Sequence, residues 1–117
     1  MGKKIIYGIP NCDITKKALK WLKDHNIDFS FHDYKKEGIT NGKLEEWCTQ
    51  VGWETLLNKK STTWRSLTAK EQAGTTGQSA AIKIMIENES IIKRPVIEGA
   101  NKLIVGFNEE NYSKQLK

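Results

Sequence analysis

The sequence is poor in cysteine and histidine. It has two cysteines, Cys12 and Cys48, and two histidines, His25 and His32, among 117 residues. The cysteines lie far apart, so the chain has neither a CxxC pair nor a set of cysteines and histidines with the spacing of zinc ligands. These absences exclude a dithiol motif and a structural zinc site, and we expect no bound metal.

Long hydrophobic runs are also missing. No stretch approaches the roughly 18 apolar residues of a membrane span. The apolar segment near the N-terminus ends at Pro10, which makes it too short for the core of a signal peptide. We therefore expect a cytoplasmic protein with no membrane partner. Hydrophobic residues make up 38% and charged residues 28% of the sequence, a globular balance that predicts a single domain over 1–117.

Arginine is scarce. The 19 basic residues include only two arginines, Arg65 and Arg94, and the lysines are spread over every segment. A nucleic-acid interface would gather its basic residues on one face, so the net charge of +5 predicts a solvated surface and no direct nucleic-acid partner. A guanidinium group offers a planar fork of donors that lysine lacks. Both arginines are therefore candidate anion ligands, with ordinary surface arginines as the alternative.

The hydrophobic pattern at the start of the chain predicts a βαβ unit. An apolar run at 4–9 is typical of a strand buried on both faces. Helical periodicity follows over 13–24, and alternation over 29–34 predicts a second strand, parallel to the first and joined to it by a right-handed crossover. The helix is expected to bury Ile14, Ala18, Trp21 and Leu22.

Helices are predicted for the middle of the chain and a hairpin for its end. Helical periodicity or a capping box marks 40–51, 68–73 and 78–88, so we place an inserted helical block at about 36–90. The helix at 78–88 is expected to bury Ala81, Ile82, Met85 and Ile86. Strands at 96–98 and 103–105 and a helix capped by Asn108 complete a ββα end. The fold class is therefore α/β.

Cys12 is the candidate nucleophile. It lies where a buried strand gives way to a helix, and unpaired amide groups and the positive end of the helix dipole meet there. Such a place stabilises a thiolate, which is the nucleophilic form. A small apolar side chain at a turn is the alternative. Asp13 would repel a thiolate, so we expect it to face solvent.

The other cysteine and the histidines are predicted to be structural. Cys48 shares the apolar side of its helix with Trp47, which favours a buried, unreactive thiol. A resolving role would require its Cα to lie within about 7 Å of that of Cys12. Both histidines are expected to be structural or solvent-facing. Composition alone favours a trans bond before Pro95.

Several motifs together resemble the arsenate reductase-like (ArsC/Spx/MgsR) family of bacterial proteins. They cover nearly the whole chain and are most similar to the YffB branch, the glutathione-dependent thiol reductases. The resemblance implies a thioredoxin-like, or glutaredoxin-like, fold with a helical insertion. The matching segments are 7–13 (YGIPNCD), Lys16-Lys17-Ala18, Trp21-Leu22, Gly52-Trp53, Leu56-Leu57-Asn58, Thr63-Trp64-Arg65, Ile92-Lys93-Arg94-Pro95 and Val105-Gly106-Phe107.

The resemblance also implies a site around Cys12. It implies a cis peptide bond before Pro95, and a substrate- or anion-binding site to which Asn11, Arg65, Arg94 and Pro95 contribute. Two features depart from the family. Arsenate reductases of this type have a third arginine after the last strand, where this chain has Val105-Gly106-Phe107-Asn108, and Spx-type regulators commonly have a CxxC switch, which is missing here.

Three functions stay open. The favoured one is a monothiol redox protein in which Cys12 attacks a disulfide, with glutathione or a similar low-molecular-weight thiol as co-substrate and no tightly bound cofactor. The second is an arsenate reductase that uses Cys12 with Arg65 and Arg94. The third is an Spx-like regulator, for which RNA polymerase is the less favoured partner.

Overall fold

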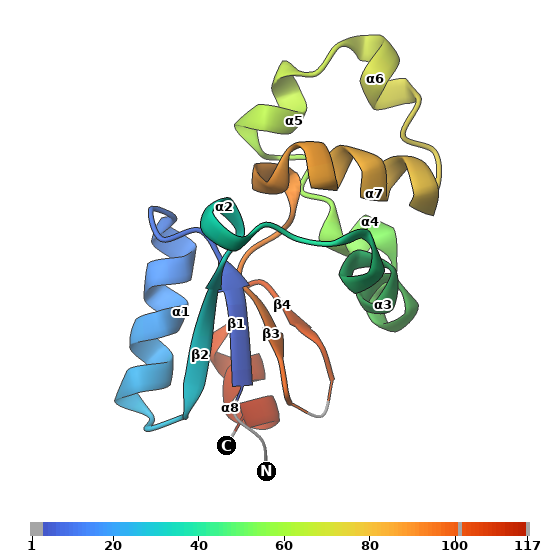
Figure 1. Ribbon diagram of the computed structural model, residues 1–117. Coiled ribbons are helices and arrows are strands. Elements are labelled where there is room, and N and C mark those ends of the chain that lie inside the picture. Colours follow the sequence, from blue (N-terminus) through green and yellow to red (C-terminus); the bar gives the residue numbers. More distant parts are fainter. Residues whose placement is uncertain (1–3, 101, 117) are drawn as a thin grey trace. The chain divides into compact units, whose positions relative to one another are not determined.

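The computed structural model describes residues 4–100 and 102–116. The chain divides into two compact units, one combining residues up to Glu37 with those from Arg94 onward, the other spanning Gly38–Lys93. The first unit contains the sheet, and the second is mainly helical (Figure 1). The predicted α/β class is confirmed. Residue 101, which falls in the predicted hairpin turn, lies outside the described residues.

A four-stranded sheet in the order β2-β1-β3-β4 forms the frame of the first unit. The central strand β1 (Lys4–Gly8) pairs in parallel with β2 (Phe29–Asp33) and antiparallel with β3 (Val96–Glu98). Strand β3 also pairs antiparallel with β4 (Ile104–Val105). Helix α1 (Asp13–Asp24) connects the two parallel strands. The predicted βαβ start and terminal hairpin are therefore confirmed.

The core of this unit joins the sheet to α1 and to α8 (Glu109–Leu116). Burying each large apolar side chain contributes roughly 1.5–3 kcal/mol, so the core fixes where α1 begins. As predicted, Asn108 caps α8, because its Oδ1 accepts a hydrogen bond from the N–H of Asn111 at 2.8 Å. The buried cluster consists of Ile6, Ala18, Trp21, Leu22, Ile97, Ile104, Tyr112 and Leu116.

Two expected burials in this unit are wrong. Ile14 is 50% exposed, and Thr15 is fully buried in its place. Helix α1 turns Thr15, Ala18 and Leu22 toward the sheet, and each helical position is rotated by about 100° from the next, so Ile14 points outward. Strand β1 is not buried on both faces either, because Ile5, which alternates with Ile6, is 36% exposed.

The second unit contains the three predicted helices and two that the sequence did not indicate. All are short: α3 (Asn41–Val51), α4 (Trp53–Leu56), α5 (Thr62–Ser66), α6 (Ala69–Ala73), α7 (Gln78–Glu87) and the 3-10 turn η1 (Glu89–Ile91). The capping box of Thr68 and Glu71 at the start of α6 is confirmed. Helices α4 and α5 have about one turn each, too short for periodicity to show. Ile86 is 36% exposed, so its predicted burial on α7 is wrong.

Gly8 allows β1 and α1 to approach each other closely. A Cβ atom at this position would lie 2.9 Å from both Cγ2 and Oγ1 of Thr15. The Thr15 side chain is fully buried and β-branched, so it has little freedom to turn away. Only glycine, which lacks a Cβ, fits against Thr15 without moving the start of α1.

We expect Gly8→Ala to lower the free energy of unfolding by about 1–3 kcal/mol, because the added methyl group overpacks the contact with Thr15. Gly42→Ala is the matched control. It lies in α3, where a Cβ meets nothing within 4 Å, and alanine should stabilise that helix by up to about 1 kcal/mol. Chemical denaturation of both variants checks this. Similar small effects at both positions would show that the strand and helix are not tightly packed.

Candidate active site

Cys12 lies in the turn between β1 and α1 and is the N-cap residue of that helix. Its backbone is extended (φ −94°, ψ 123°). Its N–H donates to the carbonyl of Ile9 at 3.1 Å, and its own carbonyl accepts from the N–H of Lys16 at 2.9 Å. The side chain is partly exposed. The turn therefore holds the sulfur at the start of a 12-residue helix, where solvent can reach it.

Arg94 approaches the same sulfur from β3. Because β3 runs antiparallel to β1, with Tyr7 opposite Val96, the residues just before β3 lie at the end of β1 that leads to Cys12. The Arg94–Pro95 peptide bond is cis. This confirms what the family resemblance implies, and the trans bond favoured by composition is wrong. Pro95 is buried.

The surroundings of Cys12 favour its thiolate. Partial burial alone would raise the pKa of the thiol. Hydrogen bonds from the Arg94 side chain and from the N–H and hydroxyl of Thr15, together with the Arg94 charge, outweigh this effect and lower the pKa of Cys12 to about 7. The Cys12 side chain makes no capping hydrogen bond. An ionised sulfur is a stronger acceptor than a neutral thiol, so donors near it favour the thiolate.

Thr15 is a residue of the candidate site that the sequence analysis missed. Its Oγ1 is buried and makes no hydrogen bond with another residue among 4–100 and 102–116, and its N–H and hydroxyl help to lower the pKa of the neighbouring Cys12 thiol. A signal was present, because Thr15 is the third residue of a helix whose N-cap is Cys12. In a capping box, this is the position that faces the N-cap.

Tyr34, the first residue of α2 (Tyr34–Glu37), is a second missed residue. It is fully buried, and its hydroxyl has no hydrogen-bond partner in the part of the chain that the structure describes. Burial and the neighbouring Tyr7 raise the pKa of Tyr34 far above its usual value, although the Arg94 charge works in the opposite direction. Tyr34 thus stays a neutral phenol and adds no negative charge near Arg94.

The structure places the predicted site residues in different surroundings. Cys12 and Arg94 are in contact through the thiol, and Asn11 and Asp13 are exposed on either side of Cys12. The exposure of Asp13 agrees with expectation. Arg65 is exposed in the last turn of α5, in the second unit. The anion-binding roles of Asn11, Arg65, Arg94 and Pro95 stay predictions.

The surroundings of the remaining cysteine and of the two histidines agree with structural roles. Cys48 is 7% exposed on α3, and burial together with the Glu45 charge raises its pKa, which agrees with the predicted buried thiol. His25 stacks on Trp21 with ring centroids 3.9 Å apart, and His32 packs against Tyr7 at 4.6 Å.

Within 4–100 and 102–116, no three His, Cys, Asp or Glu side chains gather to hold a metal ion. In the same ranges, no helix combines the length and the apolar character that crossing a membrane requires.

We expect the alkylation rate of Cys12 to rise with pH and to inflect near pH 7, because the thiolate is the reacting form. Iodoacetamide labelling in a Cys48→Ala background measures this rate.

Two variants should move the inflection of the Cys12 alkylation rate to higher pH. Thr15→Val, which loses the donor hydroxyl, should raise it by about one pH unit. Arg94→Lys should also raise it, because lysine lacks the planar fork of donors. Thr76→Val, an exposed threonine in the second unit, is the control. An inflection at or above the free-thiol value of about 8.5 would contradict an activated Cys12.

Cys48 should be alkylated more than about tenfold more slowly than Cys12 at pH 7 in the folded protein, because it is buried and mainly protonated. Mass spectrometry of the labelled peptides separates the two thiols. In urea the two rates should converge, which controls for intrinsic differences between the peptides. Equal labelling of both thiols under native conditions would show that Cys48 is accessible.

Known proteins are similar to this chain in sequence and in fold. The sequence model of the ArsC family matches residues 7–115. An uncharacterized protein of Haemophilus influenzae is 46% identical over 92% of this chain and 93% of its own length. The global transcriptional regulator Spx 2 of Lactococcus lactis is 31% identical over 90% of this chain and 80% of its own.

A solved structure, that of a YFFB protein, matches this fold closely. It is 40% identical, has a TM-score of 0.93, and the match covers 98% of this chain and 100% of that one. The order of strands and helices and the position of Cys12 at the start of α1 agree with the fold that the motifs imply. The chain is therefore a member of the ArsC family with a thioredoxin-like fold.

Proposed function

We propose that this protein is a monothiol reductase that acts on mixed disulfides of glutathione or of a similar low-molecular-weight thiol. The observation that carries the proposal is the Cys12 thiol with a pKa lowered to about 7 by contact with Arg94 and Thr15. No second cysteine follows in the turn or in α1, where the sequence continues Asp13-Ile14-Thr15. An external thiol must then complete the cycle.

The proposed cycle consists of two thiol–disulfide exchanges. In the first, the Cys12 thiolate attacks the glutathione sulfur of a mixed disulfide R–S–S–G. A disulfide bond forms between the Cys12 sulfur and the glutathione sulfur, the S–S bond of R–S–S–G breaks, and the leaving thiolate RS⁻ takes a proton from solvent. In the second, the thiolate of free glutathione attacks the same glutathione sulfur, releasing glutathione disulfide and the Cys12 thiolate. The sum is R–S–S–G + GSH → RSH + GSSG, with two electrons supplied by the glutathione pool.

The two cysteines suit different roles in this scheme. Cys12 is partly exposed, and a substantial share of it is ionised at neutral pH because of its lowered pKa. Cys48 is buried and its pKa is raised, which disfavours attack on a Cys12 mixed disulfide. This contrast supports a monothiol cycle resolved by a small thiol.

Arsenate reduction is a second candidate, because an arginine contacts the nucleophilic sulfur in a family named for that activity. An arsenate–cysteine adduct spreads negative charge over several oxygens, and such charge needs several converging donors. After β4 the chain has Phe107, whose ring packs edge-on against Tyr112 at 5.1 Å. This position therefore supplies an apolar ring in place of a third cationic donor, and arsenate reduction ranks second.

A transcriptional regulator that binds RNA polymerase ranks third. A relative at 31% identity is named as a global transcriptional regulator. The CxxC switch common in the Spx group is missing after Cys12, so a redox-controlled regulator would need another switch. The lowered pKa of Cys12 favours thiol chemistry over a purely structural turn.

Turnover of two substrates tests the proposal. We expect the wild type to reduce a peptide–glutathione mixed disulfide, with glutathione as reductant, at about 1 per second or faster. Glutathione disulfide release is followed through NADPH consumption by glutathione reductase. Cys12→Ser should be inactive because the nucleophile is gone, whereas Cys48→Ala should match the wild type.

Arsenate with glutathione should react at least about a hundredfold more slowly, because one oxyanion donor is missing. Comparable or faster arsenate reduction would reverse the order of the first two candidates. Residual activity of Cys12→Ser on the mixed disulfide would remove Cys12 from the proposed cycle.

A further inference from the structure

A surface groove of about 250 Å³ lies within the first unit, between α1 and the segment that leads from β4 into α8. Its aromatic walls are Trp21 and Phe107, whose rings both meet Tyr112 edge-on, at 5.4 and 5.1 Å. Because Tyr112 is fully buried, the core holds both walls in place. The groove is lined by Lys17, Lys20, Trp21, Asp24, Phe107 and Glu109.

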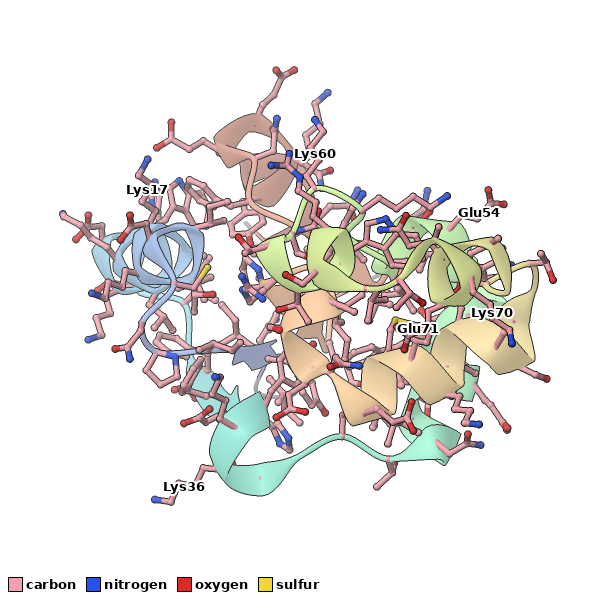
Figure 2. All side chains as sticks on the ribbon, turned by 90° about the horizontal axis from the view of Figure 1, so that it is seen from above. Lys17, Lys36, Glu54, Lys60, Lys70 and Glu71 are labelled. Atoms are coloured by element: carbon pink, nitrogen blue, oxygen red, sulfur yellow. The ribbon has the colours of Figure 1, made fainter. Side chains whose placement is uncertain are left out.

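The two segments that form the groove both lead back along the chain toward the residues around the reactive sulfur. Along α1, Lys17 is five residues beyond Cys12, a rise of about 7.5 Å, and Figure 2 shows its side chain extending outward from the helix. On the other side, Phe107 follows Gly106, whose N–H donates to the carbonyl of Pro95 at 2.8 Å. Pro95 adjoins Arg94, which contacts the Cys12 sulfur.

The charges along the groove are balanced. Lys20 and Asp24 pair with each other at 2.8 Å. Lys17 and Glu109 remain, and neither has an ion-pair partner among the residues that the structure describes. A small oxyanion would gain from Lys17 but would be repelled by Glu109. A ligand with one carboxylate and one ammonium group complements both charges, and its methylene chain can cover the aromatic walls.

We propose that this groove binds the amino-acid end of the low-molecular-weight thiol, with its carboxylate toward Lys17 and its ammonium group toward Glu109. Two extended residues span about 7 Å, which is similar to the rise along α1 between Cys12 and Lys17, so glutathione has a length that suits this arrangement. The inference rests on the proposed function. It adds the recognition of the co-substrate, which the reactive thiol alone does not provide.

Binding is tested with S-methylglutathione, which has the charged ends of glutathione but no free thiol. In an NMR titration of the wild-type protein, we expect shifts centred on α1 and on Phe107 and Glu109. Lys17→Gln and Glu109→Gln should each raise the dissociation constant about fivefold or more, because each removes one of two complementary charges. The matched controls, Lys16→Gln and Glu110→Gln, alter exposed neighbours that do not line the groove and should leave affinity unchanged.

Kinetics separate this inference from the proposed function. Lys17→Gln and Glu109→Gln should raise KM for the glutathione mixed disulfide about fivefold and leave the alkylation rate of Cys12 unchanged. Wild-type turnover with an unaltered KM in both variants would overturn the groove inference and leave the proposed function standing. Binding of S-methylglutathione that both variants weaken, without any wild-type turnover, would overturn the proposed function alone. A loss of affinity for S-methylglutathione in Lys17→Gln, but not in Glu109→Gln, would indicate a simple anion site and overturn the groove inference.

Discussion

The contact between Gly8 and Thr15 is the constraint on which the reactive sulfur depends. It brings the end of β1 within van der Waals distance of the first turn of α1, and the same buried threonine turns its hydroxyl toward Cys12. The Cys12 side chain makes no capping hydrogen bond here, and a good cap typically contributes about 1 kcal/mol. The burial of Ala18, Leu22 and their neighbours offsets that loss. The start of α1, and with it the position of the thiol, is therefore stabilised by the hydrophobic core and little by the Cys12 side chain itself.

The sheet topology brings the other groups of the site to the same place. Strands β1 and β2 are parallel, with Gly8 opposite Asp33, so Tyr34 follows β2 at the same edge at which β1 leads to Cys12. Strand β3 is antiparallel to β1, so its first residues and Arg94 meet that edge from the opposite direction. Tyr34 is a neutral phenol at neutral pH and burial raises its pKa further, so no phenolate competes with the thiolate for Arg94.

Local patterns in the sequence sufficed for the elements that depend on neighbouring residues, including the bounds of α1, the terminal hairpin, the capping box of α6 and the helix-start position of Cys12. They did not suffice where tertiary packing decides. A rotation of the helix by about 100° would bring Ile14 in place of Thr15 to the face toward the sheet. The contact between Thr15 and Gly8 fixes Thr15 on that face. The roles of Thr15 and Tyr34 could not be predicted either, because their nearness to Cys12 or Arg94 depends on the packed strands and helix.

A thiol pKa near 7 is close to the best value for the proposed attack at neutral pH. A substantial share of the thiol is then already ionised, so each further unit by which the pKa falls raises the thiolate population by a smaller factor than the one before. The same change would lower the intrinsic nucleophilicity by about threefold, because nucleophilicity falls with basicity at a Brønsted slope of about 0.4–0.5. Further cationic donors at the sulfur would therefore slow disulfide attack, although they would help to hold an oxyanion adduct. One arginine and one threonine at Cys12, with an aromatic ring at Phe107, thus suit exchange between sulfurs better than reduction of arsenate.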